Sequence, residues 1–389
     1  MTVHDEEEVA AVVAVLRSST QMGPNTAEFE ATCAGDFSKR HGIFVNSGSS
    51  ALYLGVEAAR LPAGSEVITP ALTFSTTVGC IVKNGLVPAF VDVGANTYVV
   101  DSDQVESMIS DKTRAMVIPN LMGNLPDWDR LAKLASRHDL LVVEDSADII
   151  GARYKGRNLG YYSDITTTSF YGMHVINCAG NGGMVCVNEG ALADRIRLLR
   201  SWGRSSSLFV ESESVANRFN VQVDGVPYDA KFVFEEIGYN LEGSELGAAF
   251  GLVQHRKLAA ALRRRKEVAA VQTEYFSRYP EWLDLPVPNP DADTTWFAFP
   301  LIVKEEAPFT RRDVQIFFEE RNIQTRVVFT GNITRQPGFR NVAMRVHPAG
   351  LGEADRVMER GFLIAAHHGM TAEMLAHVHQ TFDEFARQY

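Results

Sequence analysis

Short apolar runs alternate with helical patterns through the first two-thirds of this chain. The apolar runs are rich in β-branched residues, whereas the segments between them repeat apolar positions with the period of a helix. Such alternation is typical of strand–helix–strand units, whose strands form a largely parallel sheet. Strands are predicted at residues 66–69, 89–93, 115–119, 140–144, 166–170 and 184–187, with helices at 50–59, 76–84 and 128–138. Ligands of such sheets bind beyond the carboxyl ends of the strands.

The last third of the chain has a different pattern. A helix is predicted to start near residue 243, and an irregular Pro- and Asp-rich segment follows it at 286–293. A strand-like run at 296–303 and helices at 311–321 and 372–388 then favour a compact α+β unit. We therefore expect an N-terminal helix (1–20), a large α/β domain (21–266) and a small C-terminal α+β domain (267–389).

Composition narrows the class of protein. The chain has 389 residues, of which 46% are hydrophobic, and a formal net charge of −11. This charge argues against nucleic acid or an anionic membrane as a partner. The start is acidic, and no apolar run is long enough to span a bilayer, so a cytoplasmic protein is expected. The strongest basic run, residues 263–266, lies in a helical pattern and is predicted to form a solvated helix face.

A turn of small residues precedes the first predicted helix of the sheet domain. It reads Asn-Ser-Gly-Ser-Ser-Ala-Leu and contains Gly48, Ser49 and Ser50. Exposed backbone N–H groups and the helix dipole can make such a turn an anion site. By itself the same pattern is also an ordinary helix N-cap.

Polar and aromatic residues follow other predicted strands. Asp145 and Asp148 come directly after the apolar run 140–143, and Phe74 comes after the strand at 66–69. Taken separately, a strand-end Asp is most simply a helix N-cap, and Phe74 could equally fill the core.

The segment 169–174 reads Ser-Phe-Tyr-Gly-Met-His and runs from Ser169 to His174, with a glycine-rich stretch at 180–183. Asn240 lies in a Gly-Tyr-Asn-Leu sequence before a predicted helix. A further motif starts at Arg326 and reads Arg-Val-Val-Phe-Thr-Gly-Asn-Ile-Thr-Arg-Gln-Pro. Arg335 lies near its end. An isolated histidine after a strand is most often structural, so these motifs carry information mainly as a set.

Together these motifs resemble the DegT/DnrJ/EryC1/StrS family of sugar aminotransferases, over nearly the whole chain from about residue 24. The resemblance implies an aspartate-aminotransferase-like fold (fold type I) and a pyridoxal phosphate (PLP) or pyridoxamine phosphate (PMP) cofactor. It also implies a homodimer with shared active sites, because Asn240 would reach the cofactor phosphate of the neighbouring subunit. The residues that the resemblance assigns to the cofactor are Gly48, Ser49, Ser50, Phe74, Asp145, Asp148, Ser169 and Asn240.

In the family, Phe74 would stack on the pyridine ring and Asp145 would keep the pyridine nitrogen protonated, so that the ring acts as an electron sink. The family's Schiff-base lysine is replaced here by His174, which cannot form an imine with PLP. Lysine-less relatives are 4-keto-6-deoxysugar 3-dehydratases, and Asp148 matches their Glu-Asp-x-Cys-Asp pattern, where transaminases usually carry Gln. The resemblance thus implies that His174 is the acid/base of a PMP-dependent removal of the C3 hydroxyl from a nucleotide-linked 4-keto-6-deoxyhexose.

Two types of lysine-less relative are known. CDP-4-keto-6-deoxyglucose 3-dehydrases use an iron–sulfur cluster and a reductase, with cysteines where this chain has Ala147 and the serines at 205–207. GDP-4-keto-6-deoxymannose 3-dehydratases need neither and recover PMP from L-glutamate. The chain is more similar to the second type, so no iron–sulfur cluster is expected. Asn181 is a departure, since relatives commonly carry Glu there.

The substrate contacts are less specified. Arg326 or Arg335 suits recognition of the nucleotide diphosphate, although a surface or dimer ion pair would explain either residue. Adjacent His367 and His368 point apart, so no metal site is expected, and the four cysteines are interpreted as buried small side chains. Alternatives remain a PMP-dependent dehydratase of another keto-sugar or cyclitol, possibly with a reductase, an aminotransferase with a displaced lysine, and a non-catalytic member.

Overall fold

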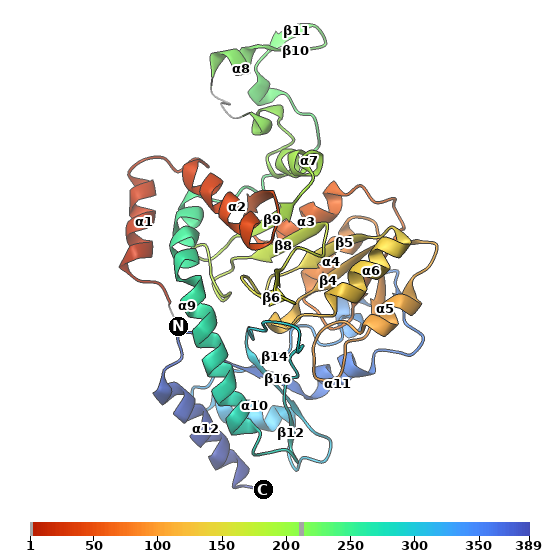
Figure 1. The fold of residues 1–389 in the computed structure, drawn as a ribbon, viewed down its shortest axis with the longest axis vertical. Coiled ribbons are helices and arrows are strands. Elements are labelled where there is room, and N and C mark those ends of the chain that lie inside the picture. The colour runs from red at the N-terminus through yellow and green to blue at the C-terminus, as the bar shows by residue number, and fades with distance from the viewer. Residues whose placement is uncertain (1–2, 210–213) are drawn as a thin grey trace.

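The computed structural model describes residues 3–209 and 214–389, and its larger part is built around an eight-stranded sheet (Figure 1). The strand β9 runs antiparallel to both of its neighbours, whereas the other strands pair in parallel. This arrangement confirms the mostly parallel sheet. In spatial order the strands are β1 (His41–Val45), β9 (Gly183–Val187), β8 (Ile165–Ser169), β5 (Leu141–Asp145), β4 (Thr113–Pro119), β2 (Glu66–Pro70), β3 (Val87–Val91) and β15 (Arg345–Val346).

Neighbouring residues of a strand point to opposite faces of a sheet, and side chains on both faces of this sheet are buried. On β4, Ala115 and Val117 join one apolar cluster, whereas Met116 and Ile118 join another. The first cluster includes helices α3 (Gly48–Ala58), α4 (Ser75–Lys83) and α7 (Gly190–Arg200). The second includes α2 (Pro24–Asp36), α5 (Ser102–Met108), α6 (Trp128–His138) and α9 (Glu245–Phe276). The strands therefore read as continuous apolar runs rather than as alternating ones.

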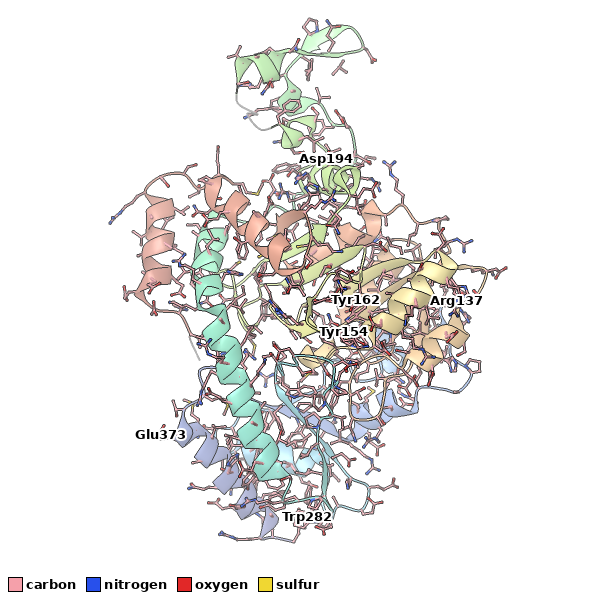
Figure 2. All side chains as sticks on the ribbon, in the orientation of Figure 1. Arg137, Tyr154, Tyr162, Asp194, Trp282 and Glu373 are labelled. Carbon is pink, nitrogen blue, oxygen red and sulfur yellow. The ribbon has the colours of Figure 1, made fainter. Side chains whose placement is uncertain are left out.

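The smaller part contains a four-stranded antiparallel sheet with the order β12-β13-β16-β14. Its elements are β12 (Leu283–Asp284), β13 (Phe299–Val303), β14 (Arg326–Val327), β16 (Gly361–Ile364), α10 (Arg311–Glu319), α11 (Gly352–Arg360) and α12 (Ala372–Ala386). In Figure 2, the labelled Trp282 lies at the lower end of this part, where it stacks on Tyr279 at 5.8 Å between ring centroids.

The two parts are joined by more than one element. The 32-residue helix α9 runs through residue 266, and α1 (Glu6–Leu16) packs against its first half. Strand β15 comes from the C-terminal third yet pairs with β3 of the large sheet. The division at residue 266/267 therefore stays a prediction.

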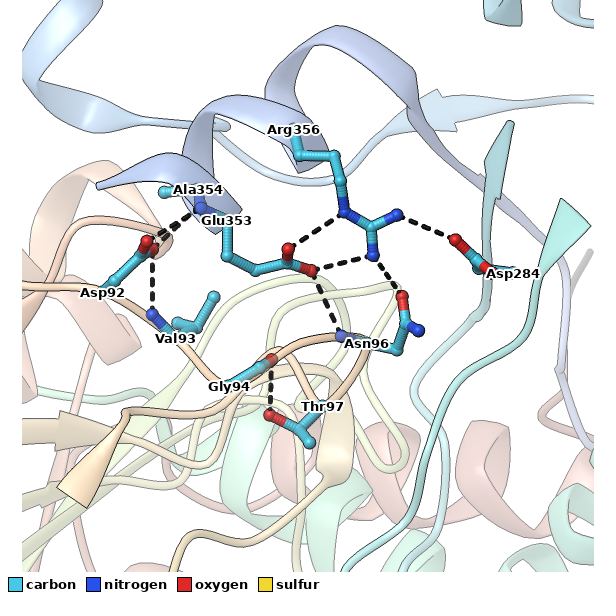
Figure 3. Close-up of polar contacts among 9 residues, drawn as sticks. All are labelled: Asp92, Val93, Gly94, Asn96, Thr97, Asp284, Glu353, Ala354 and Arg356. Atoms are coloured by element: carbon cyan, nitrogen blue, oxygen red, sulfur yellow. Dashed lines mark hydrogen bonds and ion pairs between the residues drawn. The ribbon is translucent and has the colours of Figure 1, made fainter. Parts of the chain in front are cut away.

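A polar network also fastens the two parts together (Figure 3). The carboxylate of Asp92, after β3, accepts the backbone N–H groups of Glu353 and Ala354 at 2.7 and 2.9 Å and so caps the start of α11. Arg356 then bridges Glu353 and Asp284. Because a carboxylate at a helix N-terminus satisfies otherwise unpaired donors, this contact fixes α11 against the large sheet.

An arm projects beyond α7, away from the rest of the molecule (Figure 1). It contains α8 (Val215–Phe219) and the hairpin of β10 (Val221–Val223) and β11 (Val226–Tyr228). The remaining short elements are the hairpin of β6 (Arg153–Tyr154) and β7 (Arg157–Asn158) and the 3₁₀ turns Leu121–Gly123, Ser205–Leu208, Ala230–Phe232, Ile333–Arg335 and Pro337–Phe339.

One expectation about the basic run 263–266 is wrong. Arg263 is exposed, but Arg265 is 0% exposed and lies inside the protein. Successive helix residues are about 100° apart around the axis, so a run of four cannot share one face. The four cysteines are buried and unpaired, as interpreted. Within residues 3–209 and 214–389, no helix combines the length and the apolar character needed to cross a membrane.

Gly123 provides a test of how tightly the two parts meet. Its φ is +80°, and an added Cβ would lie 2.1 Å from the carbonyl oxygen of Thr295. We expect Gly123→Ala to destabilise the protein by roughly 3 kcal/mol or more, because a left-handed backbone and a steric overlap add together. Gly156 has a similar φ of +76° but open space around it, so Gly156→Ala should cost only about 1–2 kcal/mol. Urea unfolding of both variants measures the difference, and equal losses would contradict the close packing at Gly123.

Candidate active site

The small-residue turn lies directly between β1 and α3. Ser47 is the N-cap of α3, and its hydroxyl accepts the backbone N–H of Ser50 at 3.1 Å. Gly48 is buried, and a Cβ there would lie 2.5 Å from the Cβ of Ser169 at the end of β8. Glycine is therefore required for this turn to approach β8, and Ser49 remains exposed at the helix N-terminus. The structure thus brings Gly48, Ser49, Ser50 and Ser169 together at a helix end suited to an anion.

Asp145 is the last residue of β5 and is 5% exposed. Its carboxylate accepts the hydroxyl of Thr77 at 2.8 Å and the backbone N–H of Ala147 at 3.1 Å. Burial raises the pKa of Asp145 to about 6, and the nearby Glu144 adds to the rise. A buried carboxylate with two neutral donors is well suited to a cationic partner such as a protonated ring nitrogen.

Asp148 lies one turn beyond Asp145, at the same edge of the sheet. One of its oxygens accepts the backbone N–H of Met122 at 2.9 Å, and burial raises the pKa of Asp148 to about 7. Met122 has a φ of +62°, which is unusual for a residue with a side chain. The turn Leu121–Gly123 after β4 is therefore held in a strained conformation that directs its N–H to Asp148.

His174 reaches the same region from the loop after β8. Its Nδ1 forms a hydrogen bond with the carbonyl oxygen of Ala147, between the two aspartates. Because a carbonyl only accepts, Nδ1 carries the proton and the neutral ring keeps its lone pair on Nε2. Burial lowers the pKa of His174 to about 4; the bond to Ala147 opposes this shift and the charge of Arg265 reinforces it. The imidazole is therefore neutral at physiological pH and can accept a proton at Nε2.

Phe74 is the N-cap of α4, and its ring is 49% exposed. It meets Phe329 edge to face at 6.2 Å between ring centroids. Beside this pair, the hydroxyl of Thr330 donates to the carbonyl oxygen of Thr73 at 2.6 Å. The C-terminal motif 326–337 therefore packs on the segment that carries Phe74, and the exposure of Phe74 is inconsistent with the core-filler interpretation.

Arg326, Arg335 and Asn240 have contacts outside the group of residues described above. Arg326 is exposed on β14 and donates to the carbonyl oxygen of Thr325 at 2.6 Å. Arg335 pairs with Asp355 through both Nε and Nη2. This contact fits the ion-pair interpretation of Arg335 rather than a free diphosphate ligand. Asn240 is exposed and pairs through its backbone with Ser201.

Several residues of the site were not predicted from the sequence. The ring of Phe297 lies 5.4 Å from that of His174, and Tyr171 lies 6.2 Å from it. Phe297 comes from the smaller part. The sequence pattern predicts a strand at 296–303, whereas β13 begins only at Phe299. Thr77 and Met122 hold the two aspartates. Thr77 stands in the Thr-Phe-Ser-Thr-Thr sequence that contains Phe74, but no signal in the sequence linked Met122 to Asp148.

These residues fit a PLP-type cofactor. Gly48 and the α3 N-terminus offer backbone donors for a phosphate, and Asp145 offers a buried carboxylate with no cationic partner among the described residues. Phe74, which lies between Gly48 and Asp145 in the sequence, offers an exposed aromatic ring. In contrast, the described residues contain no group of three or more His, Cys, Asp or Glu side chains that could hold a metal ion.

Known proteins are similar to this chain over almost its full length. The dTDP-4-dehydro-2,6-dideoxy-D-glucose 3-dehydratase of Saccharopolyspora spinosa is 38% identical over 392 residues, which cover 98% of this chain and 84% of that protein. The GDP-4-keto-6-deoxy-D-mannose 3-dehydratase of Yersinia pseudotuberculosis is 30% identical over 339 residues, covering 85% of this chain and 84% of the relative.

The fold is shared with solved structures. A GDP-4-keto-6-deoxymannose-3-dehydratase with a trapped PLP-glutamate geminal diamine matches with a TM-score of 0.88 and 23% identity, and the match covers 98% of each chain. At this identity the likeness shows the fold alone, which agrees with the expected aspartate-aminotransferase-like architecture. Residues 2–383 match the DegT/DnrJ/EryC1/StrS aminotransferase family. The chain therefore belongs to the DegT/DnrJ/EryC1/StrS aminotransferase family.

Proposed function

We propose that the protein catalyses C3 dehydration of a nucleotide-linked 4-keto-6-deoxyhexose with PMP/PLP as cofactor. The contact that carries this proposal is that of His174, which we align with the family lysine: its Nδ1 is bonded to Ala147, which leaves the lone pair on Nε2 for a proton. The names of the Saccharopolyspora and Yersinia relatives, both sugar 3-dehydratases, support the same reaction class.

When bound, PMP would supply an amine and a ring that takes up electrons. Asp145 would keep the ring nitrogen protonated, Phe74 would cover one ring face, and the N-terminus of α3 would hold the phosphate. Ser169 lies beside that phosphate turn. Asp148 stands at the same sheet edge, within the cofactor site.

His174 moves the proton. Its Nε2 would take up the proton that the reaction releases, and the resulting imidazolium would return it to the C3 hydroxyl as that group leaves. Burial lowers the pKa of His174 to about 4, which leaves the imidazole unprotonated at neutral pH. The same shift favours release of the proton from the imidazolium and weakens the neutral ring as a base.

The places of the lysines in the sequence and in the structure support the absence of a Schiff base near His174. No lysine occurs between Lys155 and Lys231. Lys155 pairs with Asp129 at 2.6 Å, and Lys39 is 7% exposed and donates to the carbonyl oxygen of Ser163. These contacts do not favour an aminotransferase with a displaced lysine.

We further infer that glutamate regenerates PMP and that no iron–sulfur cluster takes part. The trapped PLP-glutamate species of the solved relative supports glutamate as the amino donor. Ala147 and Ser205 to Ser207 supply no thiolate, which supports a reaction without a cluster. Of the two arginines, Arg326 is the better substrate ligand, since Arg335 is paired with Asp355.

The exposed arm supports the homodimer. It and the segment that follows carry apolar side chains in solvent, including Phe219, Tyr228, Phe234 and Ile237, the last 94% exposed. Contiguous apolar surface of this kind marks a protein interface. Since Asn240 follows the same segment, a second copy covering it would place Asn240 near the shared active site.

Replacing the imidazole tests the mechanism. We expect His174→Asn to lower kcat for loss of the C3 hydroxyl by roughly 10²–10⁴-fold, because asparagine cannot exchange a proton. The matched control is His138→Asn on the exposed end of α6, which should keep full activity. Product analysis by mass spectrometry measures both. Unchanged dehydration in His174→Asn, or a lysine labelled after PLP and borohydride treatment, would contradict the proposal.

The pH dependence of cofactor binding tests Asp145. Its carboxylate must be ionised to hold a protonated ring nitrogen, and its pKa in the cofactor-free protein is about 6. We therefore expect the affinity for PMP to fall below pH 6, by about tenfold per pH unit, as the carboxylate takes up a proton. Fluorescence titration from pH 5 to 8 measures the affinity. Asp145→Asn should bind weakly at every pH and lose this dependence, so an identical pH profile in the variant would exclude Asp145.

The exposed apolar side chains of the arm and of the segment that follows it can be tested through the state of association. We expect Ile237→Asp, in that following segment, to shift the protein from dimer toward monomer in sedimentation equilibrium, because a charge would be buried at the interface. Val287→Asp is the control, since Val287 is also exposed, at 48%, but lies outside both the arm and the segment that follows it. A monomeric wild-type protein, or equal behaviour of the two variants, would refute the role of this surface.

A further inference from the structure

Arg265, in the middle of α9, is among the largest fully buried side chains. Within the described residues its guanidinium has no carboxylate partner, and its Nη2 forms no hydrogen bond. Burial lowers the pKa of Arg265 to about 10, so the group remains a cation at neutral pH. Enclosing an unpaired cation costs stability, and proteins keep such groups mainly where function requires them.

The contacts of Arg265 are backbone carbonyls from two segments of the smaller part. Nη1 donates to the carbonyl oxygen of Phe297 at 2.9 Å, with longer contacts to those of Ala366 at 3.4 Å and Trp296 at 3.5 Å. Nε donates to Nδ1 of His368 at 3.3 Å. The guanidinium therefore gathers the segment before β13 and the segment after β16 around one point on α9.

A continuous chain of contacts leads from this point to the active site. The N–H of Phe297 donates to the carbonyl oxygen of Met122 at 2.8 Å, and the N–H of Met122 donates to Asp148 at 2.9 Å. The ring of Phe297 lies against that of His174, 5.4 Å between centroids and tilted by 59°. Arg265 thus binds the carbonyl of Phe297, whose N–H bonds to the turn that holds Asp148 and whose ring packs on the imidazole.

We propose that Arg265 is a positioning residue for His174, acting through Phe297: it holds the Phe297 backbone so that the aromatic ring packs on the imidazole and orients Nε2. This inference rests on the proposed role of His174. Arg265 itself touches neither substrate nor cofactor in this assignment. The buried charge has a second consequence, because a cation near the imidazole opposes its protonation.

The surroundings of His174 identify what else could influence its titration. The loop after β5 contributes Asp145 and Asp148 on either side of Ala147, and the loop of His174 itself contributes Tyr171. The segment after β16 contributes His367 and His368 beside Arg265, and burial lowers the pKa of both, to about 3 and about 4. Arg265 is the nearby cation that lowers the pKa of His174, while burial is the larger cause.

The test compares Arg265→Met, Arg265→Lys and a matched control, Arg311→Met. Arg311 is also partly buried, donates to the carbonyl oxygens of Met358 at 2.6 Å and Gly361 at 3.4 Å, and leaves its Nε without a partner. It differs in having no contact with the Phe297 segment. All three variants are first checked for folding by circular dichroism and urea unfolding.

One readout needs no activity: the pKa of His174 in the cofactor-free protein, from imidazole NMR resonances assigned with His174→Asn. Arg265→Met should raise this pKa, because the opposing cation is gone. Arg265→Lys keeps the charge and should move it less. Arg311→Met should leave it unchanged. An unchanged pKa in folded Arg265→Met, or an equal change in Arg311→Met, would overturn the proposal.

The second readout is steady-state kinetics with the loaded enzyme. Both Arg265 variants should lower kcat by about tenfold to a hundredfold with little change in KM, since a displaced Phe297 misplaces the base and not the substrate. Wild-type kcat in folded Arg265→Lys would also overturn the proposal, because lysine lacks the planar donor fork. Activity retained by His174→Asn would instead refute the proposed function, whatever Arg265 does.

Discussion

The hydrogen bond between His174 and the carbonyl of Ala147 is the contact on which the chemistry of this site depends. It determines which ring nitrogen carries the proton and leaves the lone pair on the other. It also links two loops from neighbouring strands, β5 and β8, so that His174 is held by the same backbone segment that follows Asp145. A change in that segment would disturb both side chains together.

Burial favours the neutral form of all three titratable groups, so it shifts the pKa of the two carboxyl groups and that of the imidazole in opposite directions. It raises the pKa of Asp145 and Asp148, which hold protons more tightly, and lowers the pKa of His174, which releases them. The result is a site with a neutral base and with carboxylates that favour a cation nearby. A protonated pyridine ring would satisfy Asp145 and restore its ionised form. The candidate site is thus electrostatically matched to a PLP-type cofactor.

Residues of the smaller part pack directly on residues of the candidate site. Phe329 and Thr330 pack on the segment of Phe74, and Phe297 packs on His174. The cap of α11 by Asp92 and the continuous helix α9 hold the two parts in a fixed relation. Because the active site is shared between the two parts, its geometry depends on their junction rather than on either sheet alone.

The sequence by itself determined the strand–helix alternation, the turn at Gly48, the strand-end Asp145 and the presence of His174 in the segment after β8. These features are local: a hydrophobic period, a small-residue turn or a single residue in a motif is visible without knowing what packs against it. Only the tertiary structure decided that Arg265 is buried, that Arg335 pairs with Asp355, and which residues surround the imidazole. Such contacts join positions from 20 to more than a hundred residues apart, like Arg335 and Asp355 or Phe297 and His174, and local patterns carry no record of them.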